Sequence, residues 1–173
     1  MRSTSPSVGP GRSMLDRLFP RQVDNGFDGH RAALWLLGLF VALKLVMSVN
    51  SIVNTASVAG TADGIPLDSF APAAAGAVLM LFALMMLAQL MLASIALAVL
   101  VRWRALVPFI YLVLIVEQVV RRSIVASYAV PRTGTTPVGT YVNYGLLALL
   151  VLGLVLSLVS PGKARATGLR REA

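Results

Sequence analysis

The chain has 173 residues, of which 57% are hydrophobic and 13% are charged. The charged share is about half of the ~25% found in ordinary soluble domains, and the mean hydropathy is +0.81. The hydrophobic residues lie in long runs, which is typical of helices that span a membrane. The sequence therefore predicts an all-α integral membrane protein.

Several kinds of site are excluded by composition. Without cysteine there is no disulfide, thiolate metal site or cysteine nucleophile. The single histidine, His30, comes before the first hydrophobic run, so a histidine-based metal site or catalytic triad inside the membrane is excluded. We therefore expect no metal, no cofactor and no catalytic residues.

The net charge of +8 comes from 15 Lys and Arg against 7 Asp and Glu. In a soluble protein this excess would indicate nucleic acid, but here the positive residues flank the hydrophobic runs. In that position they set the membrane topology and contact anionic lipid headgroups. We expect the lipid bilayer as partner and no nucleic acid.

Residues 1–30 are rich in Ser, Pro, Gly and Arg and are predicted to form a mostly disordered N-terminal tail. Within them, Ser13 and Asp16 are spaced almost as in a capping box. Residues 14–19 then carry an apolar face, which predicts a short helix lying on the membrane surface. A tail without structure is the other interpretation.

Four hydrophobic runs predict spans at about 32–54, 72–101, 105–128 and 141–159. Pro72 is a favoured residue at the first position of a helix. The very short turn 102–104 makes the second and third spans antiparallel neighbours. Turn-forming residues predict loops over 59–71 and 129–140, and 161–173 is a basic tail.

The distribution of Lys and Arg predicts the orientation. Five lie in the N-terminal segment, two in the 102–104 turn and four in the C-terminal tail, whereas the opposite side has only Arg132, or three with Arg121 and Arg122. The spans should form a four-helix bundle with both termini in the cytoplasm. The preference for Arg over Lys, 13 to 2, and the many Ala residues indicate a GC-rich genome and hence a bacterial inner membrane.

Three polar residues fall at one depth within the spans. Lys44, Gln89 and Glu117 each lie 13 residues from an arginine of the cytoplasmic boundary, or ~20 Å by helical rise. Because isolated charges at that depth are costly, we expect Lys44 and Glu117 to face each other, with Gln89 beside them. In the alternative, Glu117 pairs with Arg121 on its own helix and Lys44 reaches outward.

Other polar residues extend this layer by their helical spacing. The candidate layer contains Lys44, Gln89, Glu117, Gln118, Arg121, Arg122, Tyr111, Asn50, Asn54, Asn143 and Tyr144. It lies in the outer half of the bundle and is net positive. Two interpretations are open: a pocket for an anionic headgroup or a quinone, or a packing network that fixes the positions of the helices.

No motif in the sequence is specific for a reaction. We therefore expect a small polytopic membrane protein that serves as a structural or interaction subunit, within a larger membrane complex or by self-association. The alternative is a small oligomeric transporter, or a protein that binds lipid or quinone, using Lys44, Glu117, Arg121 and Arg122.

Overall fold

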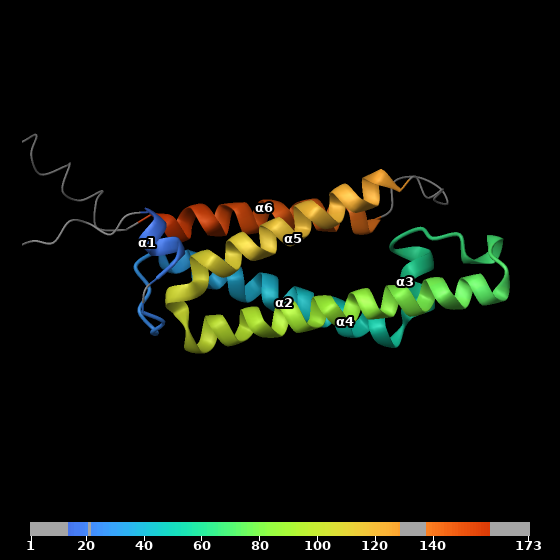
Figure 1. Cartoon of the computed structure of the whole chain (residues 1–173), viewed down its shortest axis with the longest axis horizontal. Helices are drawn as coiled ribbons and strands as arrows, with labels where there is room; N and C mark the ends of the chain where they lie inside the picture. Colours follow the sequence, from blue (N-terminus) through green and yellow to red (C-terminus); the bar gives the residue numbers. More distant parts are fainter. Residues whose placement is uncertain (1–13, 21, 129–137, 160–173) are drawn as a thin grey trace, which may run out of the picture.

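The computed structural model describes residues 14–20, 22–128 and 138–159, and every regular element within them is helical. Four long helices lie side by side along the molecule: α2 (Arg31–Val53), α4 (Pro72–Arg102), α5 (Val107–Ser127) and α6 (Val138–Leu158) (Figure 1). α2 packs against α4 and α6, and α5 packs mainly against α6. The short helices α1 (Met14–Leu18) and α3 (Thr55–Thr61) lie toward opposite ends, called the α1 end and the α3 end below.

Three of the long helices, α2, α4 and α6, are long and apolar enough to cross a membrane. α5 has 21 residues, a length that is also sufficient. It differs from the other three because it carries Glu117, Arg121 and Arg122 within its second half. The chain is therefore all-helical with three candidate membrane-spanning helices among the residues described.

The helix ends follow local sequence signals. Pro72 occupies the first position of α4, where its missing N–H costs no hydrogen bond. His30 precedes α2 and caps it, because its Nδ1 accepts a hydrogen bond of 3.1 Å from the Ala32 N–H. Between α4 and α5 the chain passes through Trp103 and a single 3-10 turn, η2 (Arg104–Leu106).

The prediction of a loop over 59–71 is wrong at residues 59–61, which belong to α3 (Thr55–Thr61). The chain leaves helical geometry at Asn54 (φ −111°, ψ 40°) and then resumes as α3, so α2 and α3 meet at a bend (Figure 1). A second short helix, η1 (Leu67–Ser69), precedes α4. The prediction of a loop over 129–140 is wrong at residues 138–140, which belong to α6. Residues 129–137 lie outside the described ranges.

The apolar core fills the α1 half of the long helices. Its fully buried side chains include Leu37, Phe40, Val107 and Leu150. Tyr111 lies among them, and its hydroxyl donates a hydrogen bond of 2.6 Å to the Ala33 carbonyl. The Tyr111 ring occupies the space beside Gly153, where a Cβ would overlap the ring.

A short N-terminal segment closes the α1 end. The helix predicted within 14–19 is confirmed as α1, which contacts α5 and α6. Its place on a membrane surface stays a prediction. Phe19 packs on Phe109 with ring centroids 5.6 Å apart. The His30 N–H then donates to the Leu156 carbonyl of α6 at 3.0 Å. Ser13 and the predicted basic tail 161–173 lie outside the described residues.

Candidate functional site

A chain of side-chain hydrogen bonds links α2, α4 and α5. Lys44 Nζ donates to Gln89 Oε1 at 3.1 Å, and Gln89 Nε2 donates to Glu117 Oε1 at 2.6 Å. Lys44 is only 7% exposed and Gln89 is 9% exposed. The Gln89 amide thus stands between the ammonium group and the carboxylate, using both its acceptor and its donor.

The same carboxylate continues the chain toward α6. Glu117 Oε1 accepts a second hydrogen bond, of 3.0 Å, from Arg121 Nε. Arg121 Nη2 donates to Gln118 Oε1 and, at 3.1 Å, to Asn143 Oδ1 of α6. Asn143 is held in turn by its Nδ2, which donates to the Gly139 carbonyl at 2.7 Å. We call Lys44, Gln89, Glu117, Arg121, Gln118 and Asn143 the polar network.

The two alternatives for Glu117 occur together in this geometry. Glu117 pairs with Arg121 on its own helix and also joins Lys44 through Gln89. A carboxylate can accept several hydrogen bonds at once, so one arrangement does not exclude the other. Among the described residues, Lys44 and Glu117 do not form a direct ion pair.

Five residues of the predicted layer do not join the polar network: Asn50, Asn54, Tyr111, and the pair Arg122 and Tyr144 described below. Asn50 and Asn54 are exposed and hydrogen-bond to each other, with Asn54 Nδ2 2.8 Å from Asn50 Oδ1. The buried stripe of α2 is instead Lys44, Ser48 and Ser51. Tyr111 points into the apolar core toward Ala33. The helical spacing of these residues fits the layer, but Asn50 and Asn54 contact each other and Tyr111 contacts Ala33.

Arg122 and Tyr144 form a separate pair at the edge of the polar network. The Arg122 guanidinium carbon lies 3.4 Å from the centroid of the Tyr144 ring, which is a cation–π contact. It joins α5 to α6 one helical turn beyond Gln118. Helical spacing assigns both residues to the predicted layer, but it does not indicate that their side chains stack.

The polar network has more positive charge and more donors than it can satisfy. Lys44 and Arg121 carry two positive charges against the single negative charge of Glu117. Gln118 is 0% exposed, and its Nε2 has no hydrogen-bond acceptor in the part of the chain that the structure describes. A buried donor without a partner costs roughly 1–3 kcal/mol, so an additional acceptor at this point would be stabilising.

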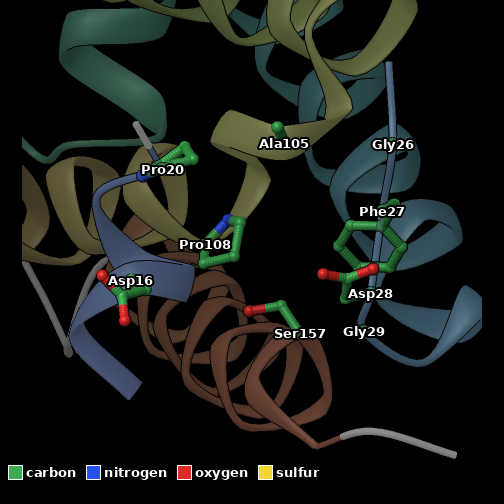
Figure 2. A pocket seen from close by; sticks show the side chains of 9 residues that line it. All are labelled: Asp16, Pro20, Gly26, Phe27, Asp28, Gly29, Ala105, Pro108 and Ser157. Carbon is green, nitrogen blue, oxygen red and sulfur yellow. The ribbon is translucent and has the colours of Figure 1, made fainter. Parts of the chain in front are cut away.

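Two pockets are found at the α1 end, and no residue of the polar network lines either of them. One, of about 30 Å³, lies between the segment before α2, the start of α5 and Ser157 of α6 (Figure 2). This volume is sufficient to hold a water molecule. The other, of about 420 Å³, is a wide groove beside Arg102 and Trp103. Neither pocket is large and enclosed enough to mark an active site.

Comparison with known proteins gives no family assignment: no protein-family model, no curated protein and no solved structure matches this chain.

Proposed function

We propose that this chain is a four-span protein of the bacterial inner membrane with both termini in the cytoplasm, in which α5 provides the fourth span of a four-helix bundle. Its charges are compatible with that position. Glu117, near the middle of α5, accepts hydrogen bonds from Gln89 and Arg121. Pairing of this kind reduces the cost of placing a carboxylate in hydrocarbon.

The positions of the two arginines support the same proposal. Arg121 and Arg122 follow Arg104 by 17 and 18 residues, so they lie ~26 Å farther along the helix. A hydrocarbon core is ~30 Å thick. With Arg104 at the cytoplasmic boundary, these two side chains are within reach of the outer headgroups.

The role that best fits the polar network is a structural one: a non-enzymatic interaction subunit. The observation that carries it is the unbroken series of hydrogen bonds from Lys44 through Gln89, Glu117 and Arg121 to Asn143. It joins α2, α4, α5 and α6 and uses most of the polar groups for contacts between helices. Interhelical polar contacts of this kind fix the relative positions of helices in membranes.

The outer surface of the long helices is apolar and available for lipid or protein. Exposed side chains on their outward faces include Val46, Leu84, Val116 and Val155. In the proposed bilayer this surface contacts lipid, a second copy of the chain or helices of a larger membrane complex.

Affinity purification in a mild detergent, with chemical cross-linking in the intact membrane beforehand, tests the interaction role. We expect the chain to be isolated with other membrane proteins or with itself, in amounts that are reproducible between preparations. A chain that is strictly monomeric and free of cross-linked partners would contradict this role. The positive surplus of the polar network favours a second property, the binding of an anionic lipid, which is developed below.

A further inference from the structure

The α3-side corner between α5 and α6 gathers hydrogen-bond donors without matching acceptors. Arg121 uses its Nε and Nη2 for Glu117, Gln118 and Asn143. Its Nη1 makes no hydrogen bond among the described residues. The Gln118 side-chain amide accepts a hydrogen bond from Arg121 through its Oε1. The Nε2 of the same amide has no acceptor among the described residues. Such a surplus of donors is commonly completed by a bound water or ion.

Arg122 adds a second guanidinium group to this corner. Among the described residues it makes a cation–π contact with the face of the Tyr144 ring and no hydrogen bond or ion pair. A guanidinium stacked on a ring keeps its N–H groups in its own plane, directed away from the ring. Its edge is thus free to make the paired hydrogen bonds that phosphate and carboxylate groups accept.

The depth of the corner decides which anion is available there. In the proposed orientation, Arg121 and Arg122 lie ~26 Å from Arg104, near the outer edge of a ~30 Å hydrocarbon core. Phospholipid phosphates line that boundary. Glu117, the carboxylate of the polar network, already accepts hydrogen bonds from Gln89 and Arg121. Among the described residues, Arg122 forms no ion pair.

We propose that Arg122, stacked on Tyr144 and assisted by Arg121, binds one phosphate group, supplied by an anionic phospholipid of the outer leaflet. Arg122 contributes the edge of its guanidinium group, and Tyr144 holds that group in a fixed plane. Arg121 connects the phosphate to the polar network, so the lipid offsets the positive surplus of the four helices. This inference rests on the proposed orientation of α5 in the membrane.

Native mass spectrometry of the full chain released from nanodiscs of mixed phosphatidylglycerol and phosphatidylcholine tests the site. We expect one phosphatidylglycerol retained per chain, and a loss of retention of about tenfold or more in Arg122→Gln, as for removal of a charge-assisted hydrogen bond. Tyr144→Leu keeps the charge but removes the stacking ring, and it should weaken retention severalfold. Arg104→Gln removes the same charge at the opposite end and should leave retention unchanged.

A second arm separates a lipid from a free anion. Thermal unfolding of the lipid-free chain in detergent is followed with added inorganic phosphate. If phosphate stabilises the wild type but not Arg122→Gln, and phosphatidylglycerol is not retained, the same chemistry is served by a free phosphate. The site is overturned if Arg122→Gln retains phosphatidylglycerol like the wild type, or if phosphatidylcholine is retained equally well and free phosphate has no Arg122-dependent effect. Chemical labelling of the two ends of α5 measures its orientation in the membrane independently. It therefore distinguishes a wrong orientation from a wrong phosphate site.

Discussion

At the scale of single residues, Gln89 is the side chain on which the polar network depends. It accepts from Lys44 and donates to Glu117, and within the described ranges no other hydrogen bond joins α4 to the network. An amide suits this place because it has both an acceptor and donors and carries no charge to be desolvated. A carboxylate or a lysine here could not serve both neighbours.

The coupling through Gln89 predicts that Lys44→Met and Glu117→Gln are not additive. Their combined effect on the free energy of unfolding should differ from the sum by about 0.5–2 kcal/mol, because each change removes one of the two charges that the shared Gln89 amide connects. The four variants would be compared by unfolding in detergent. Lys44→Met with Arg104→Gln serves as the control pair and should be additive. Additive losses for Lys44 and Glu117 as well would mean that Gln89 does not couple them.

The contact between Gly153 and Tyr111 leads to a second prediction at this scale. In Gly153→Ala the new methyl group would overlap the Tyr111 ring, which displaces the ring and its hydrogen bond to Ala33. We expect a loss of stability of about 1–3 kcal/mol. Gly145→Ala, on the same helix, meets nothing within 4 Å and should be neutral or slightly stabilising, since Ala favours helix over Gly. Equal transition temperatures for the two variants would show that Tyr111 does not occupy this space.

At the scale of helices, α5 is held by two different means. Its first half is anchored in the apolar core through Val107, Ile110 and Tyr111. Its second half is attached to α4 and α6 through Glu117 and Arg121. The two halves should therefore respond separately to a change in the polar network.

Hydrogen–deuterium exchange tests that separation. In Gln89→Leu we expect faster exchange of backbone amides over 117–127 and unchanged exchange over 107–114, because only the second half loses a hydrogen-bond partner. Ser94→Ala is the control on α4, since Ser94 bonds only to the Leu90 carbonyl of its own helix. Exchange that rises equally along the whole of α5 would contradict the division into two halves.

The sequence allows helix positions to be predicted better than helix faces. Pro72 and the Arg102–Arg104 turn define the ends of α4, and the 13-residue spacing places Lys44, Gln89 and Glu117 at one level. Helical spacing does not show whether Asn50 and Asn54, or Ser48 and Ser51, face inward with Lys44. The prediction that Asn50 and Asn54 belong to the layer is therefore wrong, because they are exposed. The sequence does not predict α3, because its Thr, Ala, Ser and Gly residues are also typical of a loop. The hydrogen bonds of Gln89 to Lys44 and Glu117, and the stacking of Arg122 on Tyr144, depend on side-chain conformations. The spacing of residues along the sequence does not predict these conformations.

At the scale of the whole molecule, backbone hydrogen bonds connect neighbouring segments at both the α1 end and the α3 end. The segment before α2 bonds to α6 through the His30 N–H and the Leu156 carbonyl. The Asp24 backbone carbonyl accepts a hydrogen bond of 3.3 Å from the Ala105 N–H, in the turn between α4 and α5. At the α3 end, the Gly139 N–H donates to the Ala62 carbonyl at 3.1 Å. The proposed membrane protein would thus present fixed ends in water and an apolar belt between them.

The proposal that α5 crosses the membrane is the claim on which the rest depends. Because the chain has no cysteine, single cysteines can be labelled without background. Arg104→Cys and Ser127→Cys place thiols at the two ends of α5, and a membrane-impermeant maleimide is added to intact spheroplasts and to inverted vesicles. We predict that Ser127→Cys is labelled only in spheroplasts and Arg104→Cys only in inverted vesicles. Labelling of both positions from the same side would contradict a fourth span and the orientation inferred from it.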